Sequence, residues 1–279
     1  MAVMARAIEV RGLRFGYTPD RPLLDGIDLS VPAGSVFCIL GPNGSGKSTL
    51  LRCILGIQHG ATGSVHICGE PLHEMSERER ARRVAYVPQH GVTGFPYNVA
   101  DMVLMGRTAH LPTFATPSAR DREAVAARLD QMGIAHLGER PFNAVSGGER
   151  QLALIARALV QDTPTIVLDE PTASLDFGNQ MHILEVIRSL ASDGRAVVLT
   201  THTPDHAFFC ASDVALLQGG RVLAHGKPED VVTGEHLSTL YGIDVQVAEI
   251  TTGPSPGDRR RVCVPLLRAS SVVVRREAN

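Results

Sequence analysis

Lysine is nearly absent from this sequence: among 279 residues it occurs only at Lys47 and Lys227. Arginine carries the rest of the positive charge, so a lysine within a glycine-rich stretch is informative. The formal net charge of -2 provides no global basic field, which argues against nucleic-acid binding. No stretch approaches the ~20 apolar residues of a membrane-spanning helix, and residues 1–7 lack the long apolar segment of a signal peptide. If the protein serves a membrane, we expect it to do so from the side.

Paired cysteine spacings are also missing. Several of the five cysteines lie in apolar runs, where a thiol simply packs, so a reducing compartment is expected. They are Cys38, Cys53, Cys68, Cys210 and Cys263. Hydrophobic residues make up 44% and charged residues 20%, which argues against a disordered or fibrous chain. The length allows one α/β domain with an insertion.

The apolar pattern is typical of an α/β core. Alternation over residues 8–17 and again over 27–31 predicts an antiparallel N-terminal sheet. Residues 36–40 are solidly apolar, end in a glycine-rich loop and precede the apolar-periodic residues 49–55, an order that predicts strand, loop and helix. Further along, we predict buried parallel strands over 165–168 and 196–200 and a crossover helix over 181–190.

Three other regions have distinct patterns. Helical pattern and several prolines predict an inserted helical subdomain of about residues 90–158, with Ser118 and Asp121 as a helix cap. Arginines and glutamates alternate over residues 77–83, which favours a solvated, ion-paired helix face. Short alternating segments and arginine clusters predict a small C-terminal appendage of residues 245–279, whose basic residues we interpret as solvated surface.

Residues 41–48 read GPNGSGKS and match the phosphate-loop pattern G-x-x-x-x-G-K-S in its required strand–loop–helix context. Backbone N–H groups of such a loop point at phosphate oxygens, and the helix N-terminus adds positive potential. Lys47 is expected to reach the terminal phosphates and Ser48 to ligate magnesium. A chance glycine turn is the competing interpretation, which this context disfavours. The predicted nucleotide-binding residues are Gly41, Pro42, Asn43, Gly44, Ser45, Gly46, Lys47, Ser48 and Thr49.

Asp169 and Glu170 close the predicted strand over 165–168. Alone they could be an exposed strand end. Beside a phosphate loop, Asp169 is expected to hold the hydration shell of magnesium, and Glu170 to polarise the attacking water as general base. The two carboxylates therefore have different predicted roles.

Ser146, Gly147, Gly148 and Glu149 precede an apolar helical face. A serine followed three residues later by a glutamate predicts a capping box. An exposed helix N-terminus with two glycines also lets its backbone approach an anion. Both interpretations are compatible, and the residues alone do not explain why one chain needs a second phosphate site.

Taken together, these motifs resemble those of the ABC ATPase family. VSGGERQ at residues 145–151 is similar to the family signature, and the resemblance extends to Gln89, to residues 173–176 and to His202. It covers about residues 8–241. The implied fold class is α/β: a P-loop NTPase parallel-sheet core with an N-terminal antiparallel β-subdomain and an inserted helical subdomain, within an ABC ATPase domain of residues 1–244.

The resemblance also implies a head-to-tail dimer, in which each ATP lies between one subunit's phosphate loop and the other's signature. Ser146 and Gly148 would contact the γ-phosphate in trans, with Gly147 and Glu149 in the same nucleotide site. Asp176 would belong to this site and communicate across the dimer. The implied catalytic residues are Glu170, His202, which would hydrogen-bond the γ-phosphate in cis, and Gln89, which would link the nucleotide to a membrane partner.

Magnesium is the one metal that we expect, with Ser48, Gln89 and Asp169 as implied ligands. The remaining histidines lack a metal-binding spacing. In the family an aromatic residue near the N-terminus stacks on adenine. Tyr17 lies at the matching place and Phe15 competes with it, although either could simply pack in the core.

Residues 99–110, VADMVLMGRTAH, resemble the helical lobe of ATPases that drive importers of metal chelates: iron-siderophore, haem, cobalamin and molybdate-type substrates. This implies an ATP- and Mg²⁺-dependent dimer, peripheral to the cytoplasmic face of the inner membrane, that works with a separate permease and, indirectly, a substrate-binding protein. The alternative is a soluble ABC ATPase with a non-transport partner, although a second ATPase domain and long coiled coils are absent. A GTPase or small-molecule kinase would leave residues 146–151 unexplained. The transported molecule cannot be read from this chain, because it passes through the permease.

Overall fold

In a computed structural model, residues 6–18, 20–89, 97–112, 115–173, 175–253 and 259–266 of the chain are described. The strands are β1 (Arg6–Phe15), β2 (Leu24–Pro32), β3 (Val36–Leu40), β4 (Thr62–Ile67), β5 (Glu70–Pro71), β6 (Val84–Val87), β7 (Thr165–Leu168), β8 (Ala196–Thr201), β9 (Asp213–Gln218), β10 (Arg221–Gly226), β11 (Val245–Thr251) and β12 (Arg259–Pro265). The α-helices are α1 (Lys47–Ile54), α2 (Glu77–Arg83), α3 (Val99–Leu104), α4 (Ala119–Gln131), α5 (Gly147–Val160), α6 (Phe177–Ser192), α7 (Asp205–Cys210), α8 (Pro228–Val231) and α9 (Gly234–Tyr241). Short 3-10 helices are η1 (Leu72–Glu74), η2 (Met105–His110), η3 (Ala135–Leu137) and η4 (Phe142–Ala144).

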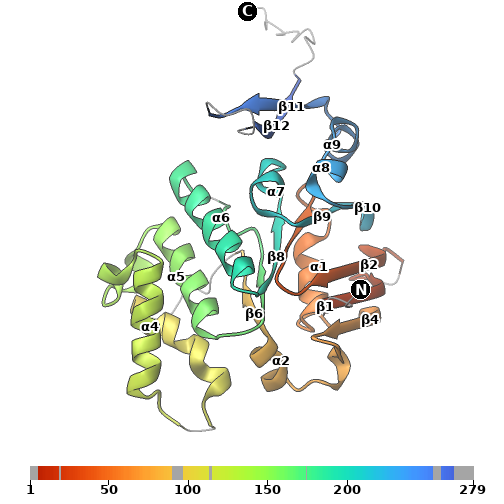
Figure 1. The fold of residues 1–279 in the computed structure, drawn as a ribbon. Helices are drawn as coiled ribbons and strands as arrows, with labels where there is room; N and C mark the ends of the chain where they lie inside the picture. The colour runs from red at the N-terminus through yellow and green to blue at the C-terminus, as the bar shows by residue number, and fades with distance from the viewer. Residues whose placement is uncertain are drawn as a thin grey trace, which may run out of the picture.

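The central sheet of the described structure has six strands in the order β10-β9-β3-β8-β7-β6 (Figure 1). Strands β9, β3, β8, β7 and β6 pair in parallel, and β10 returns antiparallel to β9. Every residue of β3, β7 and β8 is buried, which explains why these strands are largely apolar rather than alternating. The predicted parallel core is confirmed, and the loops that leave the carboxyl ends of its strands carry the candidate site.

Helix α1 packs against both sheets of the core. The second sheet is antiparallel, with the order β2-β1-β4-β5, and β2 alternates buried and exposed residues as predicted. Leu50 and Ile54 of α1 share one buried apolar cluster with Val10 of β1 and Phe37 of β3. The N-terminal sheet therefore holds the helix that begins at the phosphate loop.

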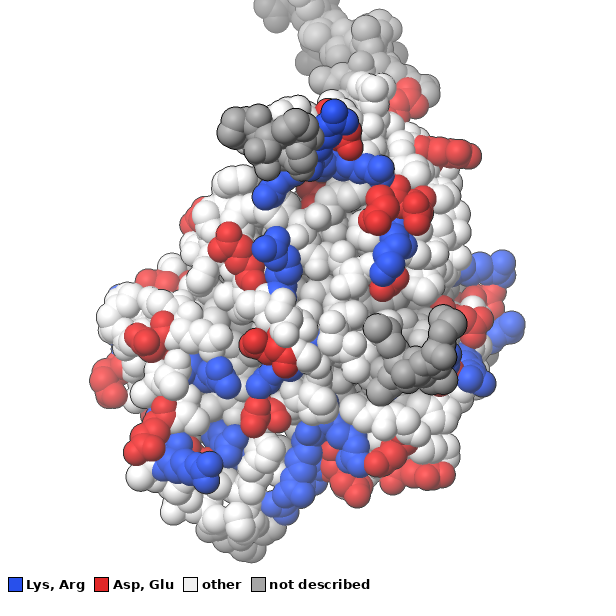
Figure 2. Space-filling model, viewed as in Figure 1, with Lys and Arg blue, Asp and Glu red and all other residues white. Residues whose placement is uncertain are grey.

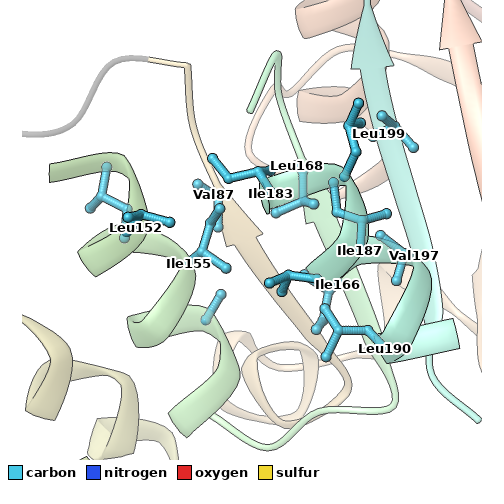
Figure 3. Close-up of a cluster of buried hydrophobic side chains, with 14 of the residues drawn as sticks. Val87, Leu152, Ile155, Ile166, Leu168, Ile183, Ile187, Leu190, Val197 and Leu199 are labelled. Carbon is cyan, nitrogen blue, oxygen red and sulfur yellow. The ribbon is translucent and has the colours of Figure 1, made fainter. Parts of the chain in front are cut away.

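Helices α5 and α6 pack on the face of the central sheet that lies away from α1. Figure 3 shows Leu152 and Ile155 of α5 and Ile187 of α6 pointing toward buried side chains of the sheet, among them Ile166 and Val197. The apolar faces predicted for these two helices are therefore buried against β7 and β8.

The described residues between 97 and 160 form helices and no strand, as expected for an inserted helical subdomain, whose bounds of about 90–158 stay a prediction. Helices α3 and α4 pack on α5. At Gly106, a Cβ atom would lie 2.2 Å from the carbonyl oxygen of Arg157, so the close approach of η2 to α5 requires glycine. The predicted cap of α4 is present: Ser118 and Asp121 form a capping box. Hydrogen bonds from Ser118, together with the nearby Arg107, lower the pKa of Asp121 to about 2.

The arginines of α2 agree with the predicted solvated, ion-paired face in part: Arg78 and Arg82 are exposed and Arg83 forms an ion pair with Glu70, but backbone carbonyls are further acceptors. Arg82 Nε donates to the carbonyl oxygen of Ala109 at 3.0 Å, and Arg78 donates to the carbonyls of Ala109 and Leu111. The last carbonyls of a helix lack partners within the helix, so these arginines supply donors to the end of η2. Residues 77–83 thus tie the core to the helical subdomain, an arrangement that charge alternation alone cannot predict.

The chain ends, within the described residues, in the antiparallel hairpin β11–β12, which packs on α7 and α9 (Figure 1). Arg259, Arg260 and Arg261 are exposed, as predicted, yet each contacts another part of the protein. Arg275 and Arg276 lie outside the described residues, and the boundary at residue 245 stays a prediction. Across the face shown in Figure 2, basic and acidic side chains of the described residues are interspersed. No described helix is long and apolar enough to span a bilayer.

Candidate functional site

The phosphate loop connects the end of β3 to the start of α1. Gly44 and Gly46 adopt left-handed backbone conformations, with φ of +79° and +102°, which side chains with a Cβ rarely allow. At Gly41 a Cβ atom would lie 2.5 Å from the carbonyl oxygen of Leu217. The loop can therefore follow this tight path only with glycine at these positions.

The ammonium group of Lys47 is enclosed by three oxygen acceptors. Its Nζ atom donates to the carbonyls of Gly41 at 2.8 Å and Pro42 at 3.1 Å, and it lies 3.1 Å from Glu170 Oε1. Both charged side chains are buried, at 4% and 7% exposure. An ammonium has three N–H donors, so a phosphate oxygen must replace at least one of these acceptors.

Ser45 provides a direct test of whether the loop fits a ligand. Its hydroxyl oxygen is buried and has no hydrogen-bond partner among the described residues. Buried polar atoms are normally satisfied, so an orphan hydroxyl in a glycine-lined loop fits an oxygen-rich ligand such as phosphate. The loop residues present are compatible with ATP.

Asp169 lies at the end of β7, almost fully buried, and faces the phosphate loop. Its Oδ1 atom accepts hydrogen bonds from Ser48 Oγ at 3.0 Å and from Thr200 Oγ1 at 2.7 Å. A carboxylate beside a hydroxyl is the oxygen-donor chemistry that Mg²⁺ prefers, so the pair fits this ion. Bound there, the ion would neutralise charge on the phosphates. The sequence does not single out Thr200, because it is only the last residue of an apolar run.

Glu170 has a φ of +48°, unusual for a residue with a side chain and a sign of local strain that the surrounding structure must maintain. Its Oε2 atom accepts from Gln89 Nε2 at 3.2 Å and lies 3.1 Å from His202 Nδ1. Its backbone N–H donates to Thr200 Oγ1 at 2.9 Å. Three side chains from three different segments, those of Lys47, Gln89 and His202, therefore surround this carboxylate.

This arrangement can perform proton transfer at the end of the sheet. A buried carboxylate in hydrogen-bond contact with an imidazole and an amide is held in one orientation, as a general base must be. In the structure the Glu170 carboxylate also forms an ion pair with Lys47. Phosphates that occupy Lys47 would release the carboxylate to contact water.

The segment containing Ser146 forms the predicted capping box at the start of α5. Ser146 N–H donates to Glu149 Oε2 at 2.8 Å, and Glu149 N–H donates to Ser146 Oγ at 3.3 Å. The first of these bonds is the main cause of the lowered pKa of Glu149. Ser146 and Gly147 are exposed, and the hydrogen bonds of Ser146 and Glu149 stay within this turn. The structure therefore does not connect Ser146 or Glu149 to the phosphate loop of the same chain by a hydrogen bond.

Asp176 and the N-terminal aromatics complete the predicted site residues. Asp176 is exposed and caps α6 by accepting from the backbone N–H of Asn179 at 2.9 Å. Phe15 is 5% exposed and packs in the core, whereas Tyr17 is 64% exposed. The hydroxyl oxygen of Tyr17 lies 3.4 Å from that of Thr49 in α1. Of the two aromatics, Tyr17 alone has a free face for a base.

Comparison with known proteins agrees with this geometry. A family model described as ABC transporter matches residues 24–173. The chain is 41% identical over 247 residues to the hemin import ATP-binding protein of Nocardia farcinica, with 87% of this chain and 85% of that protein covered. It is 36% identical over 239 residues to the molybdate import ATP-binding protein of Haemophilus influenzae, with 85% and 89% covered. A solved structure described as an inward-facing metal-chelate type ABC transporter is similar with a TM-score of 0.83 and 33% identity, covering 94% of this chain and 98% of that one.

The matched range contains the phosphate loop, the α5 capping motif and both carboxylates at the end of β7. The mixed α/β fold, with its parallel core and antiparallel sheet, is that of the similar structure. The chain therefore belongs to the ABC transporter family, as an ATP-binding subunit that hydrolyses ATP.

Proposed function

We propose that this chain energises the import of a metal chelate or an oxyanion through a separate permease. The names of the hemin and molybdate relatives, together with the metal-chelate structure, support import and this substrate class. The observation that carries the hydrolytic part is the enclosure of the Glu170 carboxylate by Lys47, Gln89 and His202.

These residues have different proposed roles in hydrolysis. Lys47 holds the terminal phosphates, and Glu170 accepts a proton from the attacking water. His202 donates a hydrogen bond to the γ-phosphate, and Gln89 reports the occupied site to the permease. Ser48, Asp169 and Gln89 would hold Mg²⁺ and its hydration shell.

The site is completed by a second copy of the chain in a head-to-tail dimer. The N-terminus of α5 supports this proposal, because this 14-residue helix begins at the exposed residues Ser146 and Gly147, and Ser146 has no hydrogen bond to the phosphate loop of its own chain. Such a helix end attracts anions. In the dimer Ser146, Gly147, Gly148 and Glu149 face the partner's ATP, and Asp176 lies at the contact between subunits.

Mixed dimers test this arrangement. Lys47→Ala removes the loop lysine. At Gly147 an added Cβ atom meets nothing within 4 Å, so Gly147→Glu should fit sterically. The helix N-terminus tolerates the new carboxylate, but the negative charge repels a phosphate bound there. A dimer of one Lys47→Ala chain and one Gly147→Glu chain retains one intact composite site, and we expect about half the wild-type ATPase rate if the two sites act independently.

The matched control places both substitutions in one chain, paired with a wild-type chain. In a trans arrangement both sites of this dimer are damaged, so we expect the rate to fall to background. Differently tagged copies isolate each mixed dimer before phosphate release is measured. The opposite result, with activity only in the second dimer, would show that each chain completes its own site.

The proposed location at the membrane depends on the proposed permease partner. We place the protein on the cytoplasmic face of the membrane, held there by permease subunits that receive the substrate from a binding protein. The alternative is a soluble ABC ATPase with a non-transport partner. Detergent extraction followed by affinity purification of the tagged chain distinguishes the two: we expect a multi-spanning permease to co-purify, and a tight soluble partner without a permease would favour the alternative.

A further inference from the structure

Two C-terminal elements hold the segment between β8 and α7 that carries His202. The hydroxyl of Tyr241, the last residue of α9, donates to the carbonyl oxygen of His202 at 2.8 Å. Asp205 lies three residues after His202, and its Oδ1 atom accepts a hydrogen bond from the backbone N–H of Cys263 in β12 at 2.9 Å. Both ends of the segment are therefore attached to the chain beyond residue 240.

The hairpin that supplies Cys263 is itself firmly attached. The guanidinium of Arg260 lies over the ring of Phe209 in α7, 5.0 Å from its centroid, and Arg261 donates to the carbonyl of Glu229 in α8 at 2.6 Å. Figure 1 shows β11 and β12 beside α7 and α9. These contacts attach the hairpin to α7, the helix that follows His202.

The imidazole of His202 contacts the Glu170 carboxylate through Nδ1, 3.1 Å from Oε2. Its side chain is 47% exposed, whereas that of Glu170, 3.1 Å away, is 7% exposed. A half-exposed ring makes few packing contacts, so the backbone that carries it largely decides where it points. Burial also raises the pKa of Tyr241 above the ordinary tyrosine value, so its hydroxyl keeps its proton even in alkaline solution.

We propose that Tyr241 and the β11–β12 hairpin are positioning elements for ATP hydrolysis, which hold the His202 segment so that the imidazole stays beside Glu170. This inference rests on the catalytic role proposed above for His202. It gives the C-terminal appendage a function inside the ATPase cycle rather than at a separate site.

The test is a double-substitution cycle on the full-length dimer. Tyr241→Phe removes only the hydroxyl and should lower kcat about 3–10-fold, the effect of one lost hydrogen bond, with the KM for ATP changed less than about twofold. In a His202→Ala background the same substitution should change kcat by less than about 1.5-fold, because nothing remains to be positioned. An effect of equal size in both backgrounds, or no effect in the wild type, would overturn the proposal.

The hairpin contact is tested separately at Asp205. Asp205→Ala removes the acceptor for the Cys263 N–H and should lower kcat. Asp205→Asn retains an acceptor oxygen and should keep kcat close to that of the wild type. Arg11→Gln, which alters an exposed pair with Glu9 in β1, far from the hairpin, is the matched control and should match the wild type. Melting temperatures identify any variant whose loss of activity reflects unfolding. An Asp205→Asn variant as slow as Asp205→Ala would contradict the positioning role of the hairpin.

The outcomes separate this inference from the proposed function. A His202→Ala variant with a wild-type rate would remove both the catalytic role of His202 and its positioning by Tyr241, while Lys47 and Glu170 would still account for hydrolysis. A His202→Ala variant that loses activity, combined with an additive Tyr241→Phe effect, would leave the proposed function intact and exclude the positioning role.

Discussion

Glu170→Gln is expected to slow ATP hydrolysis by about 10²–10⁴-fold, the range for loss of a general base. The amide has the size of the carboxylate but cannot accept a proton from water. ATP binding should survive, because Lys47 retains the carbonyls of Gly41 and Pro42 at 2.8 and 3.1 Å. Phosphate release measures the first effect, and calorimetric titration with ATP measures the second.

The same variant should accumulate as a closed, ATP-bound dimer, because hydrolysis no longer reopens it. Size-exclusion chromatography with and without ATP detects this shift. Glu185→Gln, at an exposed glutamate of α6, is the matched control and should hydrolyse ATP normally. A wild-type rate for Glu170→Gln would exclude Glu170 as the base.

Lys47→Ala is expected to weaken ATP binding by about 10–100-fold, the loss of one hydrogen bond to a charged group. A second effect follows from the structure. Glu170 is 7% exposed and loses the cation 3.1 Å away, and removing one partner of a buried ion pair costs about 3–5 kcal/mol. We therefore expect a lower melting temperature as well as weaker binding by calorimetry.

A double variant separates the two effects of Lys47→Ala. Adding Glu170→Gln removes the uncompensated charge, so the melting temperature should recover while ATP affinity stays low. Lys227→Ala is the matched control, since the only other lysine of the chain is 55% exposed and contacts Asp213 at the surface. Unchanged nucleotide binding by the stable double variant would exclude the phosphate role of Lys47.

Much of the core could be predicted from local pattern. Period-2 alternation marked the N-terminal sheet, uniformly apolar runs marked the parallel strands, and GPNGSGKS marked the loop, because each pattern is set by neighbours in sequence. The capping boxes at Ser118 and Ser146 were predictable for the same reason. Their partners lie three residues away.

Contacts between distant segments could not be predicted in this way. The positive φ of Glu170 and its ion pair with Lys47 depend on how β7, β8 and the loop meet, which no single segment encodes. The alternation at residues 77–83 suggested pairs within one helix, whereas the competing acceptors were the helix-end carbonyls of η2. For the appendage, alternation predicted its strands but not that β12 contacts α7.

The fully engaged ammonium of Lys47 has a consequence for nucleotide affinity. If a phosphate oxygen replaces Glu170 rather than a loop carbonyl, ATP binds those molecules in which Glu170 has withdrawn, and the apparent dissociation constant exceeds the intrinsic one by the reciprocal of that population. If one molecule in ten were withdrawn, the apparent affinity would be about tenfold weaker, or about 1.4 kcal/mol. The ion pair between Lys47 and Glu170 would thus set part of the ATP concentration that the site requires.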